Sequence, residues 1–354
     1  MRNKIDYISA FRGMGGADVA LEQIGKFNCV GAFEIDKYAN AFANNLLERT
    51  HNHGDITKTD ASRVARHSWF VGGFPCQSFS VAGLRKGFED QTRGTLFFDV
   101  ARILKAKRPE VVVLENVRGL VSHDKGQTLS IILNTLGELG YRCEWGLLNS
   151  KDYGLPHHRV RWYLVARHLR TQPSGTIFPL GASDKEDTRR AGEHLSYCLD
   201  ANYWKGTNTT LKGRRQLIQI NKPTHSNNRV YDPDGLSPTL NTMQGGNRQP
   251  FITTDDARVR RLTPLECFRL QGFPDSSYFL AKEELCISNT QMYKMCGNAI
   301  SVNTFKALAE RILEVHNFPG IAKEPFYEED RCLEHDKRQF EMFNDPDWNS
   351  SGMR

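Results

Sequence analysis

The sequence predicts an α/β protein in which a mainly parallel, doubly wound sheet is joined to a smaller irregular domain. Three observations predict this arrangement. In the first half, short β-rich runs alternate with helical patterns, as they do when helices connect parallel strands. From about Thr171 this periodicity gives way to clusters of Gly, Ser, Thr, Asn and Pro, which are typical of turns and loops. Helical periodicity then returns near the end of the chain.

Strands are expected where apolar, β-rich runs are bounded by turn residues. Six runs meet this description: 5–11, 29–33, 69–72, 111–114, 143–148 and 162–166. Between them, apolar residues recur at helical spacing and predict helices with one buried face. Two such sets are Leu96, Val100, Ile103 and Leu104, and Leu129, Ile132, Leu136 and Leu139. A third set predicts a late helix that lays one face on the sheet: Val302, Phe305, Leu308, Ile312 and Val315.

Composition limits the class of protein. The chain has 354 residues, of which 39% are hydrophobic and 25% charged, which is enough for one large or two modest domains with real cores. We find no run of about 18 apolar residues for a membrane span and no apolar core of a secretion signal. We therefore expect a cytoplasmic protein. The eight cysteines form no Cys-x-x-Cys pair, so we expect neither a zinc site nor a disulfide framework.

The positive charge is concentrated in the middle of the chain. The formal net charge is +6, and residues 167–229 hold eleven Lys or Arg against five Asp or Glu. A cationic segment of this kind suits contacts with phosphates. A solvated surface is the alternative that charge by itself leaves open.

The residues best suited to catalysis follow two predicted strands. The motif Gly-Phe-Pro-Cys-Gln-Ser at 73–78 places Cys76 where a strand opens into a loop, and Glu115 and Asn116 follow the run at 111–114. Open α/β sheets bind ligands at the carboxyl edge of their strands, so a thiol and an acid are expected to meet there. Cys76 is interpreted as a nucleophile.

A glycine-rich loop follows the first predicted strand. It reads Phe-Arg-Gly-Met-Gly-Gly at 11–16 and precedes a helix, where glycines let the backbone approach a ligand closely. A dinucleotide fingerprint requires Gly or Ala at position 18, but Asp18 stands there, and its charge disfavours a phosphate. A cofactor without pyrophosphate fits better than a nicotinamide. Glu34 is suited to ribose hydroxyls, and Asp55 with Ile56 to an adenine.

In order along the chain, these motifs resemble those of the DNA cytosine-5 methyltransferases, the S-adenosylmethionine-dependent enzymes of bacterial and phage restriction-modification and related systems. The likeness extends from about Lys4 to Val315. Its components are Phe11-x-Gly13-x-Gly15, Glu34, Asp55-Ile56, Pro75-Cys76-Gln77, Arg93-Gly94-Thr95-Leu96-Phe97, Glu115-Asn116-Val117, Arg159-x-Arg161, Arg261-Leu262-Thr263-Pro264-x-Glu266 and Gly297-Asn298-Ala299.

The resemblance implies the fold of the S-adenosylmethionine-dependent methyltransferases, a Rossmann-like doubly wound sheet with a smaller irregular target-recognition domain. A catalytic and cofactor-binding domain is expected at 1–168, the target-recognition domain at 169–285, a return helix completing the first domain at 286–317, and a C-terminal extension at 318–354. For that extension, a packed helix through Leu333 and Phe340 and a loose tail both stay open. The residues implied to line the S-adenosyl-L-methionine pocket are Phe11, Gly13, Gly15, Glu34, Ile35, Asp55, Ile56, Pro75, Leu96, Asn298 and Ala299.

The resemblance also implies a mechanism. Cytosine C5 is a poor nucleophile, so the Cys76 thiolate must first add to C6. Glu115 is expected to hydrogen-bond or protonate N3, and Arg161 to hold O2, while Arg159 and Asn116 orient their neighbours. A base inside a duplex cannot reach the thiol, so the target nucleotide must be flipped out.

Double-stranded DNA is the implied partner. Ser80, Arg85 and Lys86 are the expected contacts from the loop at 78–93. The expected readers of the target sequence are Arg229, Thr239, Gln244, Asn247 and Arg248. We expect a monomer that associates with the nucleoid, and a cognate restriction endonuclease in the same system stays open.

Two other functions and two departures from the family pattern stay open. An RNA methyltransferase that acts on tRNA keeps every catalytic motif, although its usual lack of a sizeable recognition domain counts against it. A catalytically silent DNA-binding protein gives no reason to keep both Cys76 and Glu115. Arg12 stands where Ala or Ser is usual and is placed to crowd the cofactor or reach its carboxylate. His157 replaces the usual glutamine two residues before Arg159.

Overall fold

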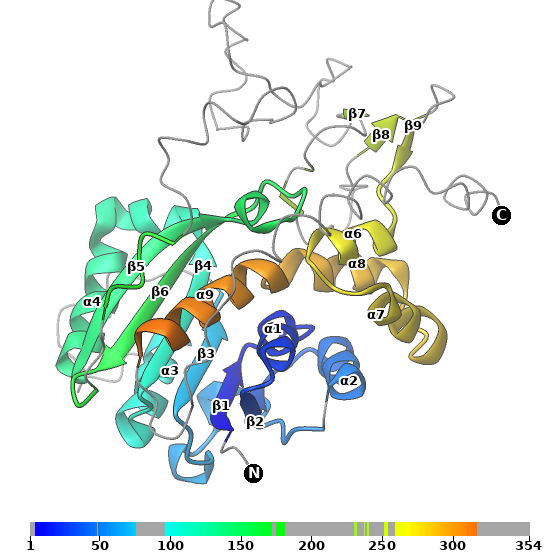
Figure 1. Ribbon diagram of the computed structural model, residues 1–354. Coiled ribbons are helices and arrows are strands. Elements are labelled where there is room, and N and C mark those ends of the chain that lie inside the picture. The colour runs from blue at the N-terminus through cyan, green and yellow to red at the C-terminus, as the bar shows by residue number, and fades with distance from the viewer. Residues whose placement is uncertain are drawn as a thin grey trace, which may run out of the picture.

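The computed structural model describes residues 4–47, 49–75, 96–171, 175–180, 230–231, 237, 239–240, 251–253 and 259–316. Its centre is a sheet of six strands in the order β2-β1-β3-β4-β6-β5 (Figure 1). The strands are β1 (Ile5–Ala10), β2 (Phe27–Phe33), β3 (Trp69–Gly73), β4 (Val111–Val117), β5 (Tyr141–Asn149) and β6 (Val160–His168). All six predicted strands are confirmed.

The sheet is parallel except at one strand. Strands β1 to β4 pair in parallel, whereas β6 pairs antiparallel with both β4 and β5. The connection from β5 to β6 contains only the short helix η5 (Ser150–Tyr153), and a connection this short joins antiparallel neighbours. Because β6 runs in reverse, its beginning lies at the edge where the parallel strands end.

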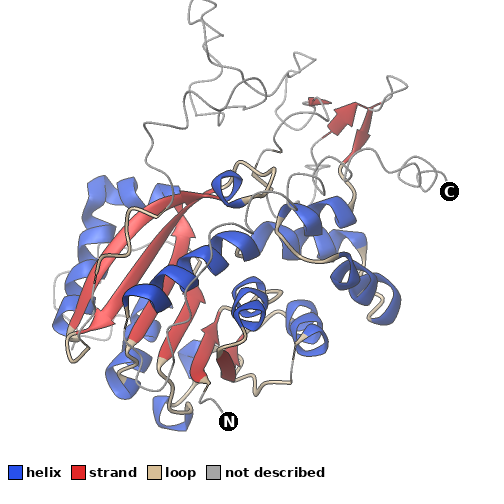
Figure 2. Cartoon of the chain, in the orientation of Figure 1, coloured by secondary structure: helices blue, strands red, loops and turns tan. Residues whose placement is uncertain are grey.

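Helices cover both faces of the sheet (Figure 2). On one face lie α1 (Gly16–Ile24), α2 (Lys37–Leu46) and α9 (Val302–Val315), whose buried side chains share a core with Trp69 and Val71. On the other lie α3 (Leu96–Lys107) and α4 (Gln127–Glu138), which share a core with Phe70. Strands buried on both faces are apolar without alternation, which is why continuous apolar runs located them correctly.

Helix α9 is the late helix that periodicity predicted. Its residues Val302, Phe305, Leu308, Ile312 and Val315 are all buried. The turn before it approaches α1 so closely that a Cβ atom on Gly16 would lie 2.0 Å from the carbonyl oxygen of Ile300. A glycine is therefore required at this crossing.

Between these parts lie shorter elements. They are η1 (Ile56–Lys58), η2 (Ala61–Arg63), η4 (Arg118–Gly126), α6 (Pro264–Leu270), α7 (Asp275–Phe279), the π-helical turn η8 (Leu280–Glu284), α8 (Asn289–Asn298) and a three-stranded sheet of β7 (Val230–Tyr231), β8 (Phe251–Thr253) and β9 (Val259–Arg261). Helix α6 begins with a capping box between Thr263 and Glu266, which satisfies otherwise unpaired amides. Among the described helices, none has the length and apolar character to cross a membrane.

The hydrophobic core continues across residue 285, where the target-recognition domain was expected to end. Helix α6 lies before this boundary, yet its Phe268 packs edge-on against Phe42 of α2. The structure thus places 264–279 in the same core as α1, α2 and α9. Most of 169–258 and all of 318–354 lie outside the described residues, so the division into domains stays a prediction.

Candidate active site

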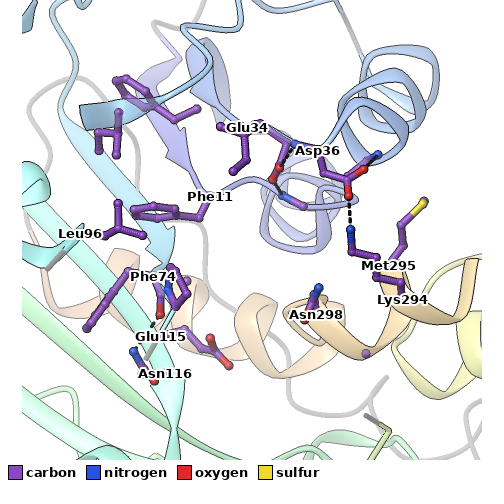
Figure 3. A pocket seen from close by; sticks show the side chains of 18 of the residues that line it. Phe11, Glu34, Asp36, Phe74, Leu96, Glu115, Asn116, Lys294, Met295 and Asn298 are labelled. Carbon is purple, nitrogen blue, oxygen red and sulfur yellow. Dashed lines mark hydrogen bonds and ion pairs between the residues drawn. The ribbon is translucent and has the colours of Figure 1, made fainter. Parts of the chain in front are cut away.

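A cavity of about 770 Å³ opens at the carboxyl edge of the sheet (Figure 3). Its walls come from the segments that follow β2, β1 and β3, from the end of β4, from the beginning of β6, from the loop at 54–56, from the first residue of α3 and from the end of α8. Since these segments follow the strand order of the sheet, Glu34 belongs to the β2 side and Glu115 to the β4 side. The predicted residues that line the cavity are Phe11, Gly13, Glu34, Ile35, Asp55, Ile56, Pro75, Leu96, Glu115, Asn116, Arg159, Arg161 and Asn298.

The loop after β1 brings backbone to the cavity. Phe11 has a φ of 52° and Gly13 a φ of 57°, a region that a side chain such as phenylalanine rarely adopts. This conformation turns the Phe11 side chain into the cavity (Figure 3). The Gly13 N–H donates to Glu34 Oε2 at 2.6 Å, so the first two loops of the site are joined directly.

The loop after β2 carries two acids. Glu34 Oε1 accepts from the Asp36 N–H at 2.7 Å, and Asp36 caps α2 by accepting from the amides of Tyr38 and Ala39. Lys294 of α8 reaches Asp36 at 2.5 Å (Figure 3). Burial raises the pKa of Asp36, but the hydrogen bond from Lys294 and those from the backbone outweigh this, so the pKa is lowered. The pair attaches α8 to the rim of the cavity.

The loop after residue 52 supplies the third acid. Asp55 caps η1, and the hydrogen bond from the Thr57 hydroxyl at 2.8 Å lowers the pKa of Asp55. Arg102 of α3 donates to the carbonyl oxygens of Ile56 and Thr59 at 2.7 and 2.8 Å. Arg102 thus holds the backbone of this loop in place. Ile56 is buried and lines the cavity.

The apolar lining suits a cofactor with an aromatic ring. Ile35 is 80% exposed although it lies beside buried strands, and it borders the cavity with Phe11 and Leu96. A flat ring bound there would cover this apolar surface. The apolar lining together with the carboxylates of Glu34 and Asp55 therefore fits a cofactor such as S-adenosylmethionine, which carries both an aromatic ring and hydroxyl and amino groups.

Glu115 and Arg161 meet on the β4 side. Val117 pairs with Arg161 across β4 and β6, and Arg161 Nε lies 3.2 Å from Glu115 Oε1. Burial raises the pKa of Glu115, against the opposing effect of Arg161 and Arg159. The result is a carboxyl group at the cavity that holds a proton more readily than an exposed glutamate does.

Asn116 fixes the backbone that leads to Cys76. Its Nδ2 donates to the Phe74 carbonyl at 2.8 Å, and its Oδ1 accepts from the Val117 N–H at 2.8 Å. Pro75, the last described residue before Cys76, lines the cavity. Cys76, Ser80, Arg85 and Lys86 themselves lie outside the described residues.

The Arg159 side chain donates hydrogen bonds to backbone carbonyl groups. Its Nη2 donates to the carbonyls of Gly297 and Ala299 at 3.1 and 2.9 Å, and its Nη1 to that of Leu240 at 3.2 Å. Burial lowers the pKa of Arg159 to about 9. The side chain ties β6 to the end of α8, which agrees with an orienting role.

His157 occupies a buried junction. Its Nδ1 lies 3.0 Å from the Leu270 carbonyl, and its Nε2 lies 3.1 Å from the Leu240 N–H. These partners require a neutral ring that donates from Nδ1 and accepts at Nε2, and burial lowers the pKa of His157 well below its usual value. A glutamine amide offers the same donor and acceptor, which explains why either residue type is suitable here.

Two expected cofactor contacts are placed elsewhere. Gly15 caps α1 in the left-handed region, and Ala299 is buried beneath Arg159. Neither lines the cavity. The Arg12 side chain, expected either to crowd the cofactor or to reach its carboxylate, is buried against Asp18 at 3.2 Å and Asn44 at 2.9 Å and does not line the cavity.

Of the expected readers of the target sequence, the structure describes Thr239, which is exposed and donates to the His158 carbonyl at 2.7 Å. Arg229, Gln244, Asn247 and Arg248 lie outside the described residues. Sequence reasoning missed Asp36, Lys294 and Met295, which line the cavity. Asp36 stands two residues after Glu34, so the position of an N-cap acid was a usable signal, whereas nothing local indicates that Lys294 reaches it.

Comparisons with known proteins identify the family of the chain. Residues 5–314 match the family model for C-5 cytosine-specific DNA methylase. The chain is 36% identical over 326 residues to the type II methyltransferase M.HhaI of Haemophilus parahaemolyticus, covering 88% of this chain and 95% of that protein. It is 38% identical to M1.ScrFI of Lactococcus lactis subsp. cremoris, covering 88% and 79%.

Solved structures share the fold. The S. pombe Dnmt2 methyltransferase superposes with a TM-score of 0.63 at 21% identity, covering 88% of this chain and 99% of that one. A putative DNA modification methyltransferase of an E. coli prophage gives a TM-score of 0.61 at 20% identity, covering 88% and 99%. With the family model spanning nearly all of the described chain, the protein belongs to the C-5 cytosine-specific DNA methylases and is a DNA cytosine-5 methyltransferase.

Proposed function

We propose that this enzyme uses S-adenosyl-L-methionine to methylate C5 of a flipped cytosine in double-stranded DNA, through a covalent bond between Cys76 and C6. The observation that carries the proposal is the single cavity that Glu34 and Asp55 share with Glu115 and Arg161. Strand β3, whose loop leads to Cys76, lies between β1 and β4. The end of β3, from which the chain leads to Cys76, therefore lies between the strands that carry the expected cofactor residues and those that carry the expected base-binding residues.

Each residue has a defined task in the proposal. Glu34, Ile35 and Asp55 hold the cofactor, which supplies the methyl group. The Cys76 thiolate adds to C6 of cytosine, and the electrons of the C5–C6 double bond make C5 nucleophilic. Glu115 donates a hydrogen bond or a proton to N3, a role that its raised pKa favours.

Arg161 is suited to hold O2 as negative charge develops there. Its Nε contacts Glu115, so the two groups that receive the cytosine edge are already aligned with one another. After methylation, loss of the C5 proton to a base or water allows the C6–S bond to break and returns the thiolate. Asn116 and Arg159 keep the surrounding backbone in position.

The DNA partner is also part of the proposal. The basic segment at 167–229 suits phosphate contacts, and Ser80, Arg85 and Lys86 belong to the loop expected to close over the flipped base. Target reading is assigned to Arg229, Thr239, Gln244, Asn247 and Arg248. The type II relatives motivate a role in restriction-modification; that the chain acts as a monomer is part of the proposal.

A trapping experiment tests the mechanism. The purified full chain is incubated with S-adenosylmethionine and a duplex rich in 5-fluorocytosine, whose C5 fluorine prevents the final elimination. We expect a denaturation-resistant protein–DNA adduct, its loss in Cys76→Ala, and none with a matched RNA. An adduct that persists in Cys76→Ala would refute the assigned nucleophile, and adducts formed with RNA alone would move the enzyme to an RNA substrate.

A further inference from the structure

We propose that Asn52 is a positioning residue that holds the two cofactor-binding acids, Glu34 and Asp55, in one arrangement through its side-chain amide. This inference rests on the proposed use of S-adenosylmethionine. Asn52 does not line the cavity, so it acts through its neighbours. Sequence patterns did not indicate it.

The segment at 51–53 extends the sheet beside β2. The Ala32 N–H donates to the His51 carbonyl at 2.9 Å, and the His53 N–H donates to the Ala32 carbonyl at 2.8 Å. Asn52 therefore forms an isolated parallel bridge with Ala32. Backbone pairing stops there, one residue before β2 ends at Phe33.

The Asn52 side chain continues the pairing where the backbone stops. Its Oδ1 accepts from the Glu34 N–H at 3.0 Å, and its Nδ2 donates to the Glu34 carbonyl at 2.9 Å. The same Oδ1 accepts from the Gly54 N–H at 3.0 Å. An amide provides a donor and an acceptor together, so both backbone groups of Glu34 are satisfied by one side chain.

These contacts bear directly on both acids. The Glu34 carboxylate accepts from the amides of Gly13 and Asp36, and the Asn52 amide holds the backbone that carries this side chain. Gly54 has a φ of 71° and directly precedes Asp55. One side chain thus sets the spacing between the expected ribose acceptor and the expected adenine acceptor.

The segment has other anchors that do not involve the amide. The His53 ring stacks on Phe33 with centroids 5.0 Å apart, and the two backbone hydrogen bonds to Ala32 stay available. Removing the amide is therefore expected to loosen Glu34 and Asp55 without unfolding the segment. A residue with a merely structural role would lower stability and leave ligand discrimination unchanged.

The test compares Asn52→Ala with Asn45→Ala in the full-length protein. Asn45 carries the same amide at an exposed position of α2, where it bonds to the Ala41 carbonyl of its own helix at 2.8 Å. The probes are S-adenosylhomocysteine and its 2′-deoxyribose analogue, measured by calorimetry. We expect Asn52→Ala to raise the Kd for S-adenosylhomocysteine about tenfold and to reduce the preference for the ribose form, whereas Asn45→Ala binds as the wild type does.

Kinetics provide a second readout. We expect Asn52→Ala to raise KM for S-adenosylmethionine and to leave kcat at saturating cofactor nearly unchanged, because the reacting groups on the β4 side are untouched. In a Glu34→Ala background, Asn52→Ala should have a smaller effect on Kd, since one of its two targets is gone. Thermal unfolding of each variant confirms that it is folded.

The outcomes separate the two proposals. If wild type binds S-adenosylhomocysteine and folded Asn52→Ala keeps the same Kd and ribose preference, the positioning role is refuted. If wild type binds neither probe, the proposed cofactor is wrong irrespective of Asn52. Should Asn52→Ala not fold, Asn52→Asp replaces it, because it keeps the side-chain volume and sets a carboxylate against the Glu34 carbonyl; the same loss of ribose preference is expected.

Discussion

The buried ion pair between Arg12 and Asp18 gives a stability prediction that can be worked from contacts. Both side chains are 1% exposed, and Arg12 Nε lies 3.2 Å from Asp18 Oδ1. Tyr7 and Ser9 also donate to the Asp18 carboxylate, at 3.0 and 2.8 Å. Burial lowers the pKa of Arg12, but the charge of Asp18 outweighs that effect and raises it. The cluster therefore holds a charged pair.

Arg12→Met removes the cation and keeps most of the apolar volume. Removing one partner of a buried ion pair costs about 3 to 5 kcal/mol, because the other charge stays buried. Asp18 lies in the first turn of α1 and keeps the hydrogen bonds from Tyr7 and Ser9. The helix dipole and these donors continue to stabilise the carboxylate, so we expect the lower end, about 3 kcal/mol.

Equilibrium unfolding in urea measures the loss. Arg311→Met is the matched control, since Arg311 pairs with Glu314 at 3.0 Å with side chains 38% and 40% exposed, and we expect it to change stability by less than about 1 kcal/mol. Arg12→Met/Asp18→Asn removes both charges and should be more stable than Arg12→Met. The reasoning is refuted if Arg12→Met loses no more stability than Arg311→Met, or if the double variant is the less stable one.

Three further predictions follow from single contacts. Gly16→Ala should destabilise the protein by about 1 to 3 kcal/mol in urea unfolding, because its Cβ would lie 2.0 Å from the Ile300 carbonyl. The control Gly137→Ala should be neutral or stabilising, because a Cβ there would have nothing within 4 Å. Equal losses of stability in the two variants would contradict the close approach at Gly16. The pKa of His157 is lowered in the folded protein, so stability should fall as the pH drops below about 6.5. His157→Gln should weaken this pH dependence when urea unfolding midpoints are compared at pH 7 and pH 5. An unchanged dependence would exclude His157 as its source. Glu115→Gln should lower kcat on the order of 10² to 10³ without changing the Kd for S-adenosylhomocysteine, and a kcat close to wild type would remove Glu115 from the mechanism.

Much of the site was predictable because its signals are local. Runs such as 69–72 and 111–114 are apolar at every position, and this lack of alternation marks strands buried on both faces. The end of each such strand then marks the ligand edge of the sheet. Glu34, Glu115 and Asn116 were located by this rule, and Asp55 by its place in the order of motifs along the chain; all four line the cavity.

Other features depend on residues far apart in the sequence. Arg12 was expected to crowd the cofactor or to reach its carboxylate, but its side chain bonds to Asp18 and Asn44. Lys294 reaches Asp36 across 258 positions. The partners of His157 come from α6 and from residue 240. Neither hydrophobic periodicity nor motif spacing predicts these contacts.

The sequence by itself determined which segments become strands and helices and which residue types stand at the carboxyl edge, because burial on two faces, helical spacing and glycine loops act over a few residues. Only the tertiary structure decided that β6 reverses and brings Arg161 to Glu115, that Arg159 donates to three backbone carbonyls, and that Asn52 ties the loops of Glu34 and Asp55 together. Each of these depends on which backbone groups and charges meet once the sheet and helices have packed, and that choice is made by contacts between distant parts of the chain.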